Sequence, residues 1–116
     1  MYSIENKKYP CSTSVTMKYI GGKWKAVILI HLIKGKKRYS ELNKEISMIT
    51  ERTLSLQLKE LEADGLISRT VKTKKTPLVV EYQLTDFGET LIPILMALAS
   101  WGKEVAANQK KVKVLA

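Results

Sequence analysis

Residues 40–83 read SELNKEISMITERTLSLQLKELEADGLISRTVKTKKTPLVVEYQ. The middle of this stretch carries Leu54, Leu58 and Leu61 at spacings of four and three, which places them on one face of a helix. A shorter helix before it and two strand-like runs after it, joined around Pro77, complete an order of elements typical of a winged helix-turn-helix. We therefore predict a mainly α-helical fold with a small β-hairpin wing.

Capping residues and turn signals set the limits of these elements. Ser40 is predicted to cap the first helix and Thr50 the second, because hydroxyl side chains satisfy free backbone N–H groups at helix starts. Gly65 is predicted to end the second helix, since glycine readily adopts the left-handed conformation found there. The wing strands are predicted at residues 66–71 and 78–84.

Two further helices are predicted before the helix-turn-helix unit. Ser12 or Thr13 can cap the first of them, and the glycine pair at residues 21–22 ends it. The second is predicted over residues 23–34, where the run WKAVILIHLI is apolar on nearly all sides and therefore suits a buried helix. Residues 1–10 are polar and carry no periodic pattern, so we expect a loose arm there.

A long helix is predicted at the C-terminal end of the chain. Thr85 caps it, and apolar residues follow at spacings of three and four. Pro93 lies inside this pattern and predicts a kink near Glu89, because proline cannot donate a backbone hydrogen bond. The tail from residue 108 to residue 116 is expected to fray. The whole chain is thus interpreted as one domain with three parts: N-terminal helices at 11–34, helix-turn-helix and wing at 38–84, and a C-terminal dimerisation helix at 85–107.

Composition limits the class of protein. A chain of 116 residues with 45% hydrophobic content can bury one modest core, and a net charge of +9 with a pI near 9.7 favours a polyanionic partner. No apolar run approaches the ~18 residues of a membrane span, so we expect a cytoplasmic protein without a membrane partner. Cys11 cannot form an intrachain disulfide, and His31 is interpreted as a structural residue. Because no catalytic or metal-binding constellation is present, we expect neither an enzyme nor a cofactor.

The second helix of the helix-turn-helix carries the most informative candidate contacts. Stepping 100° per residue from Leu54 places Arg52, Ser55, Leu56 and Lys59 on the opposite, outward face. Arginine can hold guanine through paired hydrogen bonds. Leu56 either packs on a thymine methyl group, is an ordinary exposed apolar residue, or touches a partner helix. The full set of predicted DNA contacts is Arg38, Ser40, Arg52, Thr53, Ser55, Leu56, Lys59 and the wing residues Lys72, Lys74 and Lys75.

Several motifs resemble one family of bacterial regulators. They are IGGKWK at 20–25, RYSEL at 38–42, ITERTLSLQLKEL at 49–61, DGLI at 64–67 and VEYQLT at 80–85. In these motifs and in their order the chain resembles the HxlR-type transcriptional regulators, from Cys11 to about Trp101. The resemblance implies a homodimeric winged-helix protein that represses or activates genes by binding an inverted repeat. It also implies dimerisation through the N-terminal segment and the C-terminal helix.

The pattern of the C-terminal helix agrees with a homodimer. A domain this small cannot easily cover all the apolar residues of that helix by itself. The predicted dimer interface consists of Leu91, Leu95, Leu98 and Trp101. Two-fold symmetry would then place two recognition helices roughly 34 Å apart, one turn of DNA.

Cys11 has two interpretations. Several HxlR-type proteins sense oxidants or electrophiles at an equivalent cysteine, although this chain has Ser12 where proline commonly follows. Lys7, Lys8, Lys18 and a following helix N-terminus would favour a thiolate. Because the chain has no second cysteine, oxidation would require the partner subunit or a small thiol. The alternative is a small residue that packs at the dimer interface.

Our main hypothesis is a dimeric, sequence-specific regulator that binds double-stranded DNA. A protein-interaction module on the same scaffold is the alternative, because a fold alone does not dictate function. RNA binding has less support, since no aromatic platform for unstacked bases accompanies the basic residues. The operator, the regulated genes and any small-molecule effector are not specified by the sequence.

Overall fold

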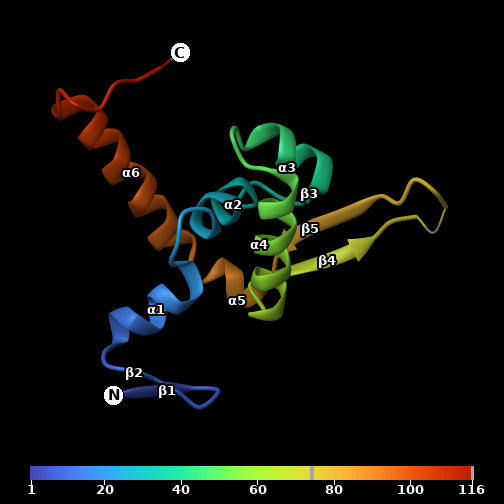
Figure 1. Cartoon of the computed structure of the whole chain (residues 1–116), viewed down its shortest axis with the longest axis horizontal. Helices are drawn as coiled ribbons and strands as arrows, with labels where there is room; N and C mark the ends of the chain where they lie inside the picture. Colours follow the sequence, from blue (N-terminus) through green and yellow to red (C-terminus); the bar gives the residue numbers. More distant parts are fainter. Residues whose placement is uncertain (74, 116) are drawn as a thin grey trace.

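The computed structural model describes residues 1–73 and 75–115, and it consists of packed helices, a small three-stranded antiparallel sheet at one side and a separate N-terminal hairpin (Figure 1). Its overall dimensions are 49 × 44 × 24 Å. The wing projects from one side of the body and the last helix from the other (Figure 1). None of the described helices is long and apolar enough to cross a membrane. In chain order the elements are β1 Tyr2–Ile4, β2 Lys7–Tyr9, α1 Ser12–Ile20, α2 Lys25–His31, β3 Lys37–Arg38, α3 Tyr39–Glu45, α4 Glu51–Ala63, β4 Ile67–Val71, β5 Val80–Leu84, α5 Asp86–Glu89 and α6 Ile92–Asn108.

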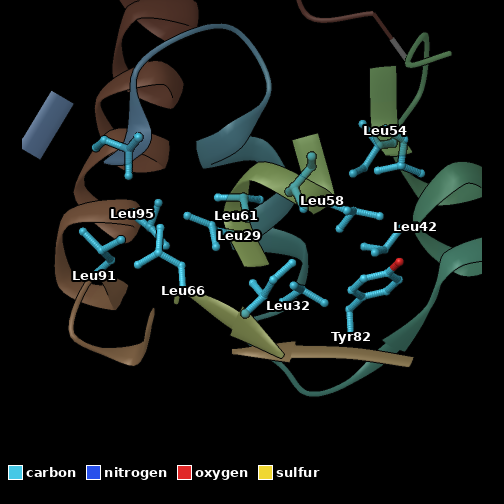
Figure 2. Packing of buried hydrophobic residues seen from close by; sticks show 14 of the residues in the cluster. Leu29, Leu32, Leu42, Leu54, Leu58, Leu61, Leu66, Tyr82, Leu91 and Leu95 are labelled. Atoms are coloured by element: carbon cyan, nitrogen blue, oxygen red, sulfur yellow. The ribbon is translucent and has the colours of Figure 1, made fainter. Parts of the chain in front are cut away.

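The hydrophobic core forms around the leucine stripe of α4. Leu54, Leu58 and Leu61 are each at most 1% exposed, which confirms the stripe predicted from their spacing. They belong to one cluster with Leu29 from α2 and Leu42 from α3 (Figure 2). Burial of these side chains therefore determines which face of α4 remains outside.

Both ends of α4 follow the predicted chemistry. The hydroxyl of Thr50 accepts a hydrogen bond from the backbone N–H of Thr53 at 3.1 Å. Gly65 has φ +77°. Its N–H donates to the carbonyl of Glu62, and the next N–H, that of Leu66, donates to Leu61, each at 3.0 Å. This pair of bonds is a Schellman motif, which ends the helix and turns the chain directly into the wing.

The wing belongs to a three-stranded antiparallel sheet with the order β3-β5-β4. Ile67 lies opposite Leu84, and Val71 opposite Val80. The predicted hairpin is confirmed, but its strands begin one and two residues later than the predicted 66–71 and 78–84. β3 adds a short third strand along the other edge of β5.

The buried helix α2 is shorter than the predicted span 23–34. It begins at Lys25 and ends at His31. The N–H of Leu32 donates to the carbonyl of Leu29, and that of Ile33 to Ile30, so the chain tightens to i−3 bonding after the helix.

The first ten residues form a β-hairpin, so the prediction of a loose arm was wrong. β1 and β2 pair antiparallel, with Tyr2 opposite Tyr9. Glu5 and Asn6 have φ values of +47° and +68°, as both central residues of a type I′ turn require. Asparagine tolerates this conformation well, whereas glutamate at the first position is not a usual turn signal, and for that reason the hairpin was missed.

The C-terminal region contains two helices rather than one kinked helix. Thr85 caps α5 as predicted, with its hydroxyl accepting the N–H of Gly88 at 3.0 Å. That helix ends at Glu89, and α6 begins at Ile92 with Pro93 in its first turn. The chain breaks here because proline lacks an N–H and is tolerated only where no helical partner is needed.

Candidate nucleic-acid interface

The outer face of α4 presents the side chains that were predicted to meet DNA. Arg52, Ser55 and Lys59 are exposed, and Leu56 is 54% exposed. They lie opposite the buried leucine stripe, so their outward placement agrees with the helical spacing. Their contact with DNA stays a prediction.

Thr53 lies at the edge of this face and is half-buried. Its hydroxyl accepts a hydrogen bond from the hydroxyl of Thr50 at 2.9 Å, while its backbone N–H donates to the same Thr50 oxygen. The side chain of Thr53 is therefore part of the cap that begins α4. This position makes it a weaker candidate for base contact than its exposed neighbours.

Tyr39 joins α3 to α4, a role that no sequence pattern indicated. Its hydroxyl donates to the carbonyl of Glu51 at 3.0 Å and lies 3.0 Å from the Oγ of Ser55. Because the single phenol proton is used by Glu51, the hydroxyl of Ser55 donates to Tyr39. Ser55 can then offer only an acceptor outwards, which suits the amino groups of adenine or cytosine in the major groove.

The start of α3 differs from the prediction. Arg38, not Ser40, is the N-cap, and its backbone N–H donates to the carboxylate of Glu41 at 2.9 Å. Ser40 is exposed in the first turn, beside a cavity of about 310 Å³. The cap lies two residues earlier than predicted, because Glu41, three positions after Arg38, accepts the backbone N–H of Arg38 and completes the first turn from there.

The base of the wing combines lysines with one glutamate. The Nζ of Lys72 lies 3.4 Å from Glu81 Oε1, and that of Lys36 lies 3.9 Å from the same atom. Lys72 is therefore partly neutralised within the protein. Lys75 is exposed on the connecting loop, and Lys74 falls outside the described residues.

A cleft of about 340 Å³ lies between α4 and the wing. We call it the α4–wing cleft; it is lined by Ser55, Lys59, Glu62, Arg69 and Tyr82. Arg69 and Tyr82 were not among the predicted contacts. Alternation along β4 could have indicated Arg69, because it lies two residues after buried Ile67 and so on the same face of the strand.

Cys11 is the N-cap of α1, in place of the predicted Ser12 or Thr13, and its thiol is exposed. Ser14, first through its backbone N–H and then through its side chain, lowers the pKa of the Cys11 thiol. The hydroxyl of Ser14 also accepts the N–H of Cys11 at 3.2 Å and donates to its carbonyl at 2.6 Å. The direction of the pKa shift agrees with the effect predicted for the helix N-terminus. Lys18, in contrast, pairs with Asp64 at 2.6 Å and does not act on the thiol.

The predicted dimer interface divides into two parts. Leu91 and Leu95 are 9% and 0% exposed and lie in the core of the protomer (Figure 2). For these two residues the prediction was wrong, because α6 packs against α2 along that stripe.

The second part of the predicted interface is exposed. Leu98 is 47% and Trp101 68% exposed, and Ile94 at 41% lies one turn earlier on the same face. Their spacing of four and three residues makes a continuous apolar stripe beside the buried one. We call Ile94, Leu98 and Trp101 the α6 stripe.

His31 is hydrogen-bonded, as interpreted from the sequence. Its Nδ1 lies 3.3 Å from the carboxylate of Glu45, which also pairs with Lys37 at 3.0 Å. Hydrogen bonds from Lys37, and then from His31, lower the pKa of Glu45. This cluster ties α2 to α3 and β3 and thereby supports the helix-turn-helix.

The described residues thus form a capped helix, α4, whose outer face lies beside a wing that carries several cations. Residues 19–110 match the model of the family described as HxlR-like helix-turn-helix. The chain belongs to this family. It is accordingly a DNA-binding transcriptional regulator, and the resemblance seen in the motifs is confirmed.

Relatives with known names and structures are similar over most of the chain. The regulator is 50% identical over 94 residues to the HTH-type transcriptional regulator YdeP of Bacillus subtilis, covering 81% of this chain and 73% of that protein. Its structure is similar to that of the redox regulator HypR in the reduced form, with a TM-score of 0.77, 45% identity and coverage of 82% and 93% of the two chains. Similarity to oxidised HypR gives a TM-score of 0.76, 47% identity and coverage of 81% and 96%.

Proposed function

We propose that the regulator is a homodimer that binds an inverted-repeat operator, with one α4 in the major groove of each half-site. The outward placement of Arg52, Ser55 and Lys59, opposite the buried stripe of α4, is the observation that carries this proposal. The α6 stripe supports the dimer, because monomeric proteins rarely leave such a continuous apolar surface uncovered. We further propose that the regulator acts by binding and not by catalysis, as its relatives are transcriptional regulators.

Selection of duplexes from a random pool with the reduced protein tests this proposal directly. We expect an inverted repeat whose half-site centres are roughly one DNA turn apart. A single unpaired half-site would contradict the dimer. Absence of any enriched sequence would favour the protein-interaction alternative, for which exposed Leu56 and the α6 stripe offer a surface.

Arg52 is expected to contribute directly to operator recognition. It is exposed in the first turn of α4, the part of a recognition helix that reaches deepest into the groove. Arg52→Ala should weaken operator binding by about 1–3 kcal/mol, with a smaller effect on a random duplex. Fluorescence anisotropy with both duplexes measures this difference.

Lys110→Ala provides a matched control, because it removes a cation shortly after α6 ends at Asn108. Figure 1 shows this end of α6 on the opposite side of the molecule from the wing. An equal loss on operator and random duplex in Arg52→Ala would assign Arg52 to the phosphate backbone and not to a base.

We also propose that Cys11 is a redox-responsive site. Its thiol is exposed and its pKa is lowered, so more of it is thiolate at neutral pH than in an ordinary cysteine. The similar regulator HypR has been solved in both reduced and oxidised forms. Since the chain has one cysteine, diamide would take two electrons and two protons from Cys11 and a second thiol, joining them as a disulfide. The second thiol is Cys11 of the partner subunit or a small thiol.

Two measurements check the role of Cys11. The rate of iodoacetamide alkylation should rise with pH and reach half its maximum below the usual thiol range, because only the thiolate reacts and its pKa is lowered. Diamide should change operator affinity in the wild type and not in Cys11→Ser. Slow alkylation of the dimer, with an unchanged operator affinity after diamide, would indicate the alternative of a structural residue at the interface.

A further inference from the structure

Arg69 occupies an unusual position in the wing. Residues directly opposite in an antiparallel pair share a sheet face, so Arg69 shares a face with Tyr82. The neighbouring pairs on this face are apolar, Ile67 with Leu84 and Val71 with Val80. Arg69 nevertheless remains exposed. An arginine is thus placed on the face that turns towards α4 and not on the outer face of the hairpin.

The opposite wall of the α4–wing cleft also presents a cation. Lys59 is exposed on α4 and lines the same cleft as Arg69. Tyr82, which is 8% exposed, closes the floor. Glu62 lies one turn further along α4 and would repel an anion, so the part of the cleft beside Lys59 and Ser55 is the more favourable for negative charge.

We propose that Arg69 and Lys59 together bind one backbone phosphate of the DNA in the α4–wing cleft. This inference rests on the proposed function. When a recognition helix lies in the major groove and a wing reaches the adjacent minor groove, the sugar–phosphate strand between the two grooves passes between helix and wing. The guanidinium fork of Arg69 can donate to two phosphate oxygens, while Lys59 supplies a compact charge from the other side.

A phosphate contact fixes the position of the protein on the DNA but does not distinguish one base sequence from another. Arg69→Ala should therefore lower the affinity for operator and for a random duplex by the same factor, about tenfold. The plot of log affinity against log salt concentration should become less steep by about 1, because one fewer counterion is released. Arg69→Lys should retain part of the affinity, since it keeps the charge and loses the fork.

A phosphate scan makes the test specific. Each phosphate of one half-site is replaced in turn by an uncharged methylphosphonate, and binding of the wild type, Arg69→Ala and Lys59→Ala is measured. We expect one position at which the replacement weakens DNA binding by the wild type. At that position the replacement should not weaken binding by either variant, because each variant has already lost the contact. Lys110→Ala serves as the control and should follow the wild type at every position.

The inference is overturned if Arg69→Ala leaves the salt dependence of binding unchanged. It is also overturned if methylphosphonate replacement abolishes the effect of Arg69→Ala at one phosphate and the effect of Lys59→Ala at another. If the wild type selects a duplex and Arg69→Ala binds that duplex with the same affinity and the same salt dependence, this inference alone is refuted. A wild type that binds no duplex refutes the proposed function and the phosphate site with it. If circular dichroism shows that Arg69→Ala is unfolded, Arg69→Gln and Lys59→Ala carry the same measurements.

Discussion

Gly88→Ala is expected to destabilise the regulator by about 3 kcal/mol, close to the upper end for an overpacked site. A Cβ at this position would lie far inside the contact distance of the carbonyl oxygen of Leu66, and this neighbour is backbone. The same oxygen accepts the N–H of Thr85 at 3.1 Å, and the Thr85 hydroxyl donates to the carbonyl of Gly65 at 2.6 Å. The clash therefore falls where α4, the wing and α5 are joined. Urea denaturation followed by circular dichroism measures the free energy of unfolding.

Gly102→Ala is the matched control for this substitution. Gly102 lies within α6, and a Cβ there would meet nothing within 4 Å. Alanine should stabilise the helix by about 0.5–1 kcal/mol, because it restricts the unfolded chain more than glycine does. Similar unfolding free energies for the two variants would show that α5 can shift away from Leu66 at little cost.

Trp101→Asp is expected to convert the proposed dimer into a monomer. Trp101 is 68% exposed and lies in the α6 stripe, so the substitution should leave the protomer folded. At an interface an aspartate would be buried without a partner, and loss of a central aromatic residue typically costs 2 kcal/mol or more of binding energy. Operator affinity should fall by about a hundredfold, since the two half-sites would no longer be held together. Sedimentation and anisotropy measure these two effects.

Val114→Asp introduces the same charge at another exposed apolar position, in the tail after α6. It should leave the sedimentation behaviour of the wild type unchanged. A dimer that persists in Trp101→Asp would require the subunits to meet elsewhere, with the exposed side chains of α1 and α5, Met17 and Phe87, as the next surface to alter.

Much of the candidate interface was predictable because its signals are local. The spacing of Leu54, Leu58 and Leu61 determines the outer face of α4, and Thr50 and Gly65 cap its ends through bonds within a few residues. Such patterns act over one or two helical turns, which a sequence displays directly. The strands of the wing were predictable for the same reason, because their strand-like residues follow one another directly in the sequence.

Other features depended on signals that are weak or ambiguous along the chain. The turn at Glu5 and Asn6 lacks glycine, so the N-terminal hairpin did not stand out from a polar arm. Arg69 reads as one more surface cation until strand register places it opposite Tyr82. The role of Tyr39 has no local signal, because its hydroxyl joins Glu51 and Ser55, which lie 12 and 16 residues further along the chain.

The sequence by itself determined the order of the helix-turn-helix and the wing, the buried stripe of α4 and therefore the residues that α4 turns outwards. Tertiary structure alone decided which apolar stripe of α6 is covered within the protomer. Leu91 and Leu95 are buried while Leu98 and Trp101 are exposed, although all four repeat at helical spacing. The physical reason is that periodicity identifies apolar faces, whereas the burial of a face depends on a neighbour far away in the chain, here α2 against α6.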